Sequence, residues 1–414
     1  MRDIELYRHL LGLEQPWIVM KVALDVKEQR VDVWVDHGEG LKWPCPACDR
    51  KLPLYDHSEE RAWRHLDSCQ FQTLLHARPP RVECSEHGVR QVVLPWAEPR
   101  ARFTALFERL AIDVLLETSI EAATRILRIS WDEAWYLLER AVRRGLLARK
   151  PRVRPFLGVD EKSFAKRYRY ATIVCDLEEA EVVYVEKERK KESLDRYFTS
   201  LTPEEREGIE AVAMDMWEPY VQSVRQHLPR GEEKLVFDRF HVMGHMNEAV
   251  DEVRRRENEE LREGGDSTLT GTKHLWLFAR ENLPARHEER FEELRRADLK
   301  TARAWGLKEN LRRLWQFMHP SSAWRHWREW FAWAIRSKLA PVLKVARMIR
   351  THLRGVMNFY DHPITNAVSE GLNSKIQKFK QVACGFRNFE HFRIAIFFHC
   401  GGLQLYPVTH GIPG

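Results

Sequence analysis

The stretch at residues 156–164 constrains the fold of this chain more than any other. Its apolar run, Phe-Leu-Gly-Val, ends in the carboxylate of Asp160, and charged residues follow at once. This pattern is typical of a buried strand that delivers an acid to the edge of a core. Asp215 ends a second apolar run, and Glu370 lies in a segment with helical spacing. Carboxylates that gather without basic partners need a cation, so the three acids predict a site for Mg²⁺ or Mn²⁺.

The composition is that of a globular protein with room for more than one core. A length of 414 residues allows roughly two or three domains, and 44% of the residues are hydrophobic. The 67 Lys and Arg against 61 Asp and Glu give a net charge of +6. This charge permits a polyanionic partner but does not establish one.

The sequence also bears on the cellular compartment. No apolar run approaches the roughly 18 residues that span a membrane, and the first residues carry acids where a signal peptide would be apolar. The seven cysteines are an odd number and do not resemble a disulfide framework. We therefore expect a soluble, cytoplasmic, reduced protein that has no membrane partner.

Two motifs have the spacing of metal-binding knuckles. Cys-Pro-Ala-Cys at 45–48 and Cys-Ser-Glu-His at 84–87 each enclose two residues, as in sites that grip one tetrahedral ion. In a reduced protein, two such half-sites favour zinc over unrelated buried thiols by roughly four to one. Cys69, His57 and His65 have no partner at this spacing, and we expect them not to bind the ion. The sequence thus predicts a zinc ribbon that binds one structural Zn²⁺ through Cys45, Cys48, Cys84 and His87.

Residues 103–147 have the apolar spacing of helices, with a turn at Ile129-Ser130. Ser130 is a candidate N-cap, so a short helix, a tight turn and a second helix follow one another. This order predicts a helix-turn-helix, although other compact helical bundles share it. A stretch with seven basic residues and no acid follows, which predicts contacts to DNA phosphates but is also typical of a solvated linker. Its basic residues are Arg140, Arg143, Arg144, Arg149, Lys150, Arg152 and Arg154.

From residue 156 onward, strands and helices alternate. Three strands in succession, then helix, strand, helix and strand, give the order of an RNase H-like fold. In that fold the first and fourth strands are neighbours, so Asp160 and Asp215 would lie close together. The predicted strands cover 156–160, 168–177, 181–186, a run that leads into Asp215, and 235–238.

Residues 241–340 predict a mostly helical insertion rich in Trp and Arg. We expect its tryptophans to form a core and not a base-stacking surface, by roughly three to one. Helices are then predicted near 341–354 and 364–380, the second of which carries Glu370. On this helix, Lys375, Lys378 and Lys380 are candidates for contacts to DNA phosphates beside the acid.

Taken together, these motifs are similar to those of bacterial insertion-sequence transposases of the DDE class, specifically the ISL-three family. The resemblance covers nearly the whole chain. It depends on Cys-Pro-Ala-Cys48, Trp63–Asp67, Glu83–Gly88, Leu157–Phe164, Ala213–Trp217, Val236–His241, Lys300–Trp305, Asn366–Ser374 and Gly385–Asn388.

The resemblance implies that Asp160, Asp215 and Glu370 form a catalytic triad, and that the helical insertion fills the gap before Glu370. Asp238 and His241 match an accessory D-x-x-H element; their alternative reading is a strand-end acid and a helix-start histidine. The triad would hold two Mg²⁺ or Mn²⁺ ions, with Asp160 bridging both.

The implied function is cleavage and strand transfer at the terminal inverted repeats of an insertion sequence, by a homodimer or larger assembly on DNA. A zinc-ribbon regulator with an inactive core and a metal-dependent nuclease are the alternatives. The implied fold is a multidomain α+β protein. Its predicted parts are an N-terminal hairpin region (1–40, with the hairpin at 17–35), the zinc ribbon (41–98), the helix-turn-helix with its basic linker (99–154), the RNase H-like core (155–240 and 341–414) and the helical insertion (241–340).

Overall fold

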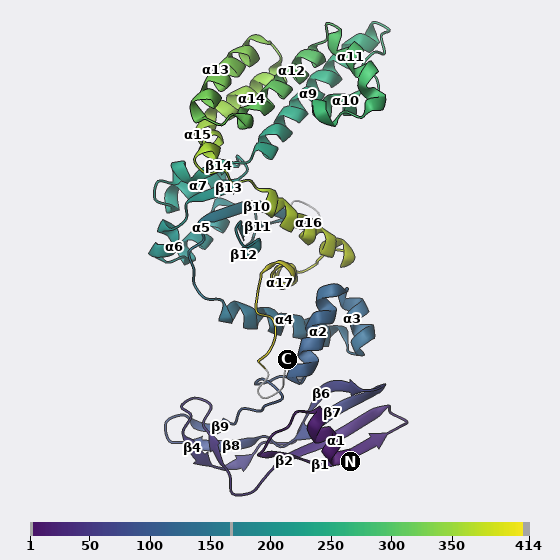
Figure 1. The fold of residues 1–414 in the computed structure, drawn as a ribbon, viewed down its shortest axis with the longest axis vertical. Coiled ribbons are helices and arrows are strands. Elements are labelled where there is room, and N and C mark those ends of the chain that lie inside the picture. Colours follow the sequence, from purple (N-terminus) through teal and green to yellow (C-terminus); the bar gives the residue numbers. More distant parts are fainter. Residues whose placement is uncertain (1–2, 166–168, 409–414) are drawn as a thin grey trace. The chain divides into compact units, whose positions relative to one another are not determined.

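The computed structural model describes residues 3–165 and 169–408 (Figure 1). These residues form two compact units, one of residues 3–150 with 397–408 and the other of 151–396. The sequence-based boundaries differ from this division at the C-terminal end, because the segment after 396 belongs to the first unit. There Leu403 packs at Gly145, and the Tyr406 hydroxyl donates to Asp113 Oδ1 at 2.6 Å.

The first unit begins with a four-stranded sheet in the order β1-β2-β7-β6. The predicted hairpin is confirmed, because β1 and β2 pair antiparallel through a turn at residues 26–29. Alternate residues of these strands face a core that includes Trp17, Val33, Trp63 and Leu75. The elements are α1 (Asp3–Leu10), β1 (Trp17–Asp25), β2 (Arg30–His37), β6 (Arg61–Ser68) and β7 (Phe71–Ala77).

Two smaller sheets follow the hairpin. β3 (Lys42–Pro44) pairs with β4 (Lys51–Pro53), and β8 (Pro80–Cys84) lies between β5 (Asp56–His57) and β9 (Gly88–Gln91). Each of the two predicted knuckles therefore lies in the turn of an antiparallel hairpin.

Three helices complete the first unit: α2 (Ala105–Glu117), α3 (Ile120–Leu127) and α4 (Trp131–Ala148). The predicted helix-turn-helix is confirmed. Arg128 ends α3 in the left-handed conformation, and Ser130 begins α4 with a capping box that it shares with Glu133. Local chemistry thus explains both the break and the restart that the sequence predicts.

The second unit contains a five-stranded sheet in the order β12-β11-β10-β13-β14. β10 pairs antiparallel with β11 and parallel with β13, so the first and fourth strands are neighbours, as predicted. The expected start of the second strand at Tyr168 lies outside the described residues. The strands are β10 (Phe156–Ala165), β11 (Arg169–Asp176), β12 (Glu181–Lys187), β13 (Ala211–Met214) and β14 (Leu235–Phe237). The helices between them are α5 (Lys191–Ser200), α6 (Pro203–Glu207), α7 (Glu218–His227) and α8 (Gly231–Lys234).

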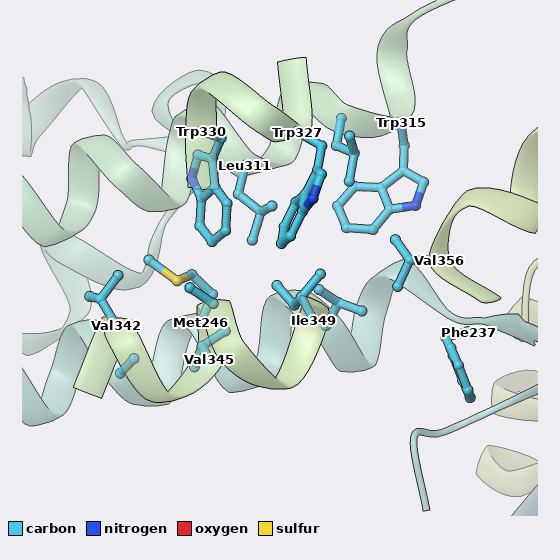
Figure 2. Close-up of a cluster of buried hydrophobic side chains, with 14 of the residues drawn as sticks. Phe237, Met246, Leu311, Trp315, Trp327, Trp330, Val342, Val345, Ile349 and Val356 are labelled. Carbon is cyan, nitrogen blue, oxygen red and sulfur yellow. The ribbon is translucent and has the colours of Figure 1, made fainter. Parts of the chain in front are cut away.

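A helical region follows β14, as the sequence predicts. Figure 2 shows Trp327 and Trp330 facing Met246 and Ile349 across a buried apolar layer. Trp276, Trp305 and Trp315 are also buried, whereas Trp324 and Trp333 are exposed. The prediction of a tryptophan core is therefore confirmed for five of the seven tryptophans in residues 241–340. Its helices are α9 (Arg239–Glu263), α10 (Lys273–Leu277), α11 (Glu288–Arg296), α12 (Lys300–Arg312), α13 (Pro320–Arg336), α14 (Ala340–Thr351) and α15 (Leu353–Met357), with 3₁₀ turns at Arg280–Asn282, Ala285–His287, Arg313–Gln316 and Asn358–Tyr360.

The chain then returns to the sheet through α16 (Ala367–Val382), and α17 (Phe389–Cys400) follows. Asn358 marks this return, because its buried side-chain amide lies within 3.0 Å of the carbonyls of Glu232, Glu233 and Leu235. None of the described helices is long and apolar enough to cross a membrane.

Candidate active site and metal centre

Three acids follow paired residues of three adjacent parallel strands, of which β13 and β14 end just before the acid and β10 continues beyond it to Ala165. Val159 pairs with Met214, which in turn pairs with Phe237. The next residue of each strand is an acid, and these acids are Asp160, Asp215 and Asp238. The third also caps α9 by accepting from Phe240 N at 2.9 Å. The register thus brings together two of the three predicted catalytic acids and one predicted accessory residue.

Glu370 reaches the same edge from α16. A Cβ built on Gly158 would lie 2.2 Å from Ser369 Oγ, so only glycine in β10 lets the start of α16 lie this close. One turn further on, Asn373 Nδ2 donates to Asp160 Oδ2 at 2.5 Å. Burial raises the pKa of Glu370, and the nearby Asp238 and Asp160 raise it further. All three predicted triad members therefore belong to one electrostatic cluster.

The cluster carries more negative charge than its surroundings neutralise. Burial raises the pKa of Asp160, and the neighbouring Asp215 adds to this effect. Burial also raises the pKa of Glu161 to about 7, and the two nearby aspartates reinforce the shift. The charge of His241 acts in the opposite direction on Asp160 and Glu370, so the second accessory residue also lies near the acids. Such an arrangement of oxygen donors favours a cation.

The guanidinium of Arg189 lies beside two acids of the cluster. Its Nη1 lies 2.9 Å from Glu161 Oε1, and its Nη2 lies 3.9 Å from Asp215 Oδ2. The guanidinium carbon sits 4.1 Å from the centroid of the Trp217 ring. The arginine is therefore held between an aromatic face and two carboxylates.

Sequence reasoning missed Glu161, Arg189 and Asn373. A signal was available for two of them, since Glu161 follows Asp160 directly and Asn373 lies three residues after Glu370 on the same helix face. Arg189 has no such signal, because only the pairing of β10 with β13 and the course of the chain after β12 bring it to the acids.

The carboxylate oxygens of this cluster are the type of ligand that a hard divalent ion prefers. No three of these acids, however, bring their ligand atoms within 4.8 Å of one another. Within residues 3–165 and 169–408, the groups of three or more potential ligands that converge within 4.8 Å both lie in the first unit. The acids of β10, β13 and α16 are not among them. Carboxylates that repel one another in this way are suited to two ions that separate them.

The lysines of α16 differ in their surroundings. Lys375 and Lys378 are exposed, while Lys380 is partly buried and donates to the Ser163 carbonyl of β10. Arg189 also lines a cavity of about 770 Å³. Its lining includes the cations Arg169, Lys187, Arg189, Lys190 and Arg387, and the aromatic rings Phe164, Tyr170 and Phe389.

The basic residues at 140–154 mostly have partners within the protein. Arg140 is buried and pairs with Glu98 and Glu108, and Arg144 pairs with the same two acids. This pairing argues against phosphate contacts by Arg140 and Arg144, because their guanidinium groups are already saturated. Three other residues of the stretch also contact the protein, since Arg149 donates to the Gly401 carbonyl, and Arg152 and Arg154 lie beside Asp176. Arg143 and Lys150 are exposed.

The four predicted zinc ligands converge in the first unit, with their ligand atoms within 4.8 Å of one another. Cys48 Sγ and Cys84 Sγ are 3.8 Å apart, and Cys84 Sγ lies 3.5 Å from His87 Nδ1. A tetrahedral ion with Zn–S bonds of about 2.3 Å separates two sulfurs by about 3.8 Å, so the donor set fits zinc. Cys69 lies outside this group, and the described cysteines form no disulfide.

The prediction for His65 is also consistent with the structure. Its buried Nδ1 shares a hydrogen bond of 2.9 Å with Thr104 Oγ1, and burial lowers its pKa to about 4. Thr104 in turn caps α2, so His65 serves the packing of this helix.

Comparisons with known proteins match the chain along most of its length. A family described as "Transposase" matches residues 157–396, which are more than half of the chain. A "zinc-finger of transposase IS204/IS1001/IS1096/IS1165" matches residues 42–87, and a "Helix-turn-helix domain of transposase family ISL3" matches residues 92–142.

Whole-chain relatives agree with these matches. The chain is 27% identical over 356 residues to the "Transposase for insertion sequence element IS1001" of Bordetella parapertussis, covering 85% of this chain and 87% of the relative. It is 26% identical to the "Transposase for insertion sequence element IS1557" of Mycobacterium tuberculosis, covering 94% of this chain and 93% of the relative.

Proposed function

Because the chain belongs to the ISL3 family of transposases, we propose that it binds the terminal inverted repeats of its own insertion sequence and cuts and joins DNA at their ends. We assign the chemistry to Asp160, Asp215 and Glu370, and the fold of their sheet to the RNase H-like class. The strand order β12-β11-β10-β13-β14, with two antiparallel pairings followed by two parallel pairings, supports this fold.

One observation carries the assignment of the triad. Asp160 and Asp215 follow paired residues of adjacent parallel strands. The helix α16 brings Glu370 close enough for the charge of Asp160 to raise the pKa of Glu370. Three acids from segments far apart in the sequence meet at one sheet edge. A protein that only binds DNA has no use for this convergence.

Asp160, Asp215 and Glu370 would hold two Mg²⁺ or Mn²⁺ ions. When bound, such ions activate water or a 3′-hydroxyl and stabilise the leaving oxygen of an in-line displacement. Asn373 orients the Asp160 carboxylate, and Arg189 holds Glu161 and the Asp215 side of the site. Asp238 and His241 remain accessory. No side-chain nucleophile takes part, so we expect no covalent protein–DNA intermediate.

We assign DNA recognition to the first unit and further DNA contacts to exposed basic residues of the second unit. The zinc ribbon, with Zn²⁺ on Cys45, Cys48, Cys84 and His87, and the helix-turn-helix would recognise the repeats. Arg143, Lys150, Lys375 and Lys378 are exposed and suited to phosphates. The basic and aromatic cavity beside Arg189 is suited to the sugar-phosphate chain near the cut. Pairing of two ends calls for a dimer or larger assembly on DNA, and we expect the protein to act in the cytoplasm.

The test is incubation of the full chain with Mg²⁺, a labelled duplex that carries the element's own end, and a target plasmid. The expected products are a nick at the end of the repeat and a joined strand. Asp160→Asn and Glu370→Gln should lose both products and keep end binding in a mobility-shift assay. The exposed acid Asp298, substituted as Asp298→Asn, is the matched control and should leave both products intact.

Other outcomes separate the alternatives. Cleavage that persists in Asp160→Asn would overturn the assignment of the triad. A nick without any joined product would indicate a nuclease. Specific binding without cleavage in either Mg²⁺ or Mn²⁺ would indicate a regulator with an inactive core.

A further inference from the structure

A second cluster of potential metal ligands lies in the first unit, separate from the zinc ligands. Asp36 and His37 end β2, and His57 ends β5. One ligand atom of each lies within 4.8 Å of the other two. The Nε2 atoms of His37 and His57 are 2.9 Å apart, although twenty residues separate them in the sequence. In the sequence alone His57 looks isolated, and the fold supplies its partner.

The hydrogen bonds of His37 determine which of its nitrogens can bind a metal. Its Nδ1 lies 2.8 Å from the Gly38 carbonyl oxygen. A carbonyl only accepts hydrogen bonds, so Nδ1 carries the proton and Nε2 of the neutral ring carries the lone pair. This is the arrangement of metal-binding histidines, whose second nitrogen donates to a carbonyl or carboxylate. The lone pair of His37 Nε2 is therefore directed at His57.

The surroundings hold the two rings in place. They stack with centroids 5.1 Å apart and an interplanar angle of 14°. Trp17 and Trp43 meet His37 edge-on, with centroids 6.0 and 5.0 Å away. Both histidines are half-buried by this packing, whereas Asp36 is exposed. The cluster thus has a rigid apolar wall on one side and an entry path for an ion on the other.

The carboxylate ligand, Asp36, is oriented as well. Asp36 Oδ1 accepts from the backbone N of His37 at 2.8 Å, which leaves Oδ2 available. His57 is held by the strand that carries it, because the neighbouring Asp56 accepts from Arg81 Nε of β8 at 2.6 Å. β8 ends at Cys84, so the cluster lies on the same small sheet as a zinc ligand.

We propose that Asp36, His37 and His57 form a second binding site for a divalent transition-metal ion, of the class of Zn²⁺, that joins the sheet of β2 to the sheet of β5. Two imidazole nitrogens and one carboxylate suit such an ion, with solvent in the open position. Two nitrogens on one tetrahedral ion at about 2.0–2.1 Å lie about 3.3 Å apart, so the rings need to separate by only about 0.4 Å.

The alternative is a plain hydrogen bond from His57 Nε2–H to His37 Nε2. This hydrogen bond explains why the two rings lie close together, but it does not explain why the Asp36 carboxylate lies beside them. The two cases differ in the number of ions that the chain binds. They also differ in the chemistry of the second site, which has nitrogen and oxygen ligands and no thiolate.

The test is the metal content and cobalt spectrum of the full-length protein. After equilibration with Zn²⁺ buffered at a concentration that fills the cysteine and histidine ligands but not the proposed carboxylate site around Asp160, we expect two ions per chain in the wild type and one in His57→Gln. With Co²⁺, the first site shows thiolate-to-cobalt charge transfer in the near ultraviolet. The second equivalent should add visible absorption without charge transfer, and His57→Gln should lose only that increment. His9→Gln, an exposed histidine of the same unit, is the matched control and should bind two ions.

One zinc ion per chain in the wild type would overturn the proposal without any variant. Two ions in both the wild type and His57→Gln would overturn it equally, because the second ion would then lie elsewhere. Near-ultraviolet circular dichroism of His57→Gln establishes whether the unit keeps its fold, and Asp36→Asn provides a second variant with the same expected loss.

Discussion

Asn373 of α16 donates a hydrogen bond from Nδ2 to Oδ2 of Asp160 on β10. The bond joins a helix to a strand that lies 213 residues earlier, and it fixes one carboxylate of the proposed metal site. Partners of metal ligands of this kind typically change metal affinity by about 10–100-fold when they are removed. The helix that supplies Glu370 therefore also orients Asp160.

For Asn373→Ala we expect the Mg²⁺ concentration at half-maximal cleavage to rise by about 10–100-fold, because the Asp160 carboxylate loses its orientation. Cleavage at saturating Mg²⁺ should recover in large part. A Mg²⁺ titration of end cleavage measures this effect. Ser374→Ala, which removes only a bond to the Glu370 carbonyl on an exposed face, serves as the control. An unchanged Mg²⁺ dependence in Asn373→Ala would contradict the orienting role.

Gly158→Ala tests the close approach of α16 to β10. The added Cβ would meet Ser369 Oγ at 2.2 Å and Leu177 Cδ2 at 2.8 Å, so the helix must shift. We expect a loss of about 1–3 kcal/mol in stability. Cleavage should fall by about 100-fold, because Glu370 follows Ser369 directly.

Thermal unfolding and end cleavage measure the two effects of Gly158→Ala. Gly371→Ala on the same helix is the control for stability, because a Cβ there meets nothing within 4 Å. Its melting temperature should stay or rise slightly, as expected for alanine in a helix. A melting temperature of Gly158→Ala equal to that of the wild type would show that α16 adapts without strain.

The basic stretch provides a prediction that separates binding from folding. Lys150→Gln should lower the slope of log affinity against log salt by about 1, because one phosphate contact is lost. Arg140→Gln should instead lower stability by about 3 kcal/mol, since Glu108 is buried and loses part of its pairing. Salt titrations of end binding and urea unfolding distinguish the two. A normal salt slope in Lys150→Gln would remove this lysine from the DNA interface.

The burial of His65 should make the stability of the protein depend on pH. Burial lowers its pKa to about 4 from the usual 6.5, so the unfolded chain binds the proton more tightly. The stability from the neutral ring is complete above pH 6.5 and is lost as the pH falls toward 4. The loss should reach about 3 kcal/mol.

Scanning calorimetry at pH 7.5 and pH 5 measures this dependence. His65→Gln should reduce the difference between the two pH values, whereas the exposed His9→Gln should leave it unchanged. The reverse sign, with His65→Gln more sensitive to acid than the wild type, would contradict the assignment.

Zinc removal should affect the first unit before the second. All four proposed ligands lie between residues 45 and 87, whereas the sheet of β10 lies wholly in the second unit. A chelator, or Cys48→Ser, should therefore weaken binding to the repeats and leave the second unit resistant to proteolysis. Cys69→Ser, an exposed cysteine outside the cluster, is the matched control. Unchanged end binding after loss of zinc would count against a role of the ribbon in recognition.

The sequence by itself determined the features that depend on local chemistry. The knuckle at 45–48, the capping box of Ser130 and the apolar strand segment that leads into Asp160 each arise from a few consecutive residues. Their spacing and conformation follow from local bonding, so they could be predicted. The order of strands and helices also indicated that Asp160 and Asp215 would be neighbours, and β10 and β13 do pair.

Only the tertiary structure decided which distant residues share a site. Arg189 reaches the acids through the course of the chain after β12, and no local pattern marks it. The spacing of Asn373 from Glu370 is visible in the sequence, but only the packing of α16 against β10 shows that it binds Asp160. The same holds for Arg140, which looks like a phosphate-binding residue in the sequence but is buried against Glu108. His37 and His57 meet only because two sheets bring their strands together. The pairing of charges and ligands over long separations depends on the packing of the whole core, which a local reading of the sequence does not contain.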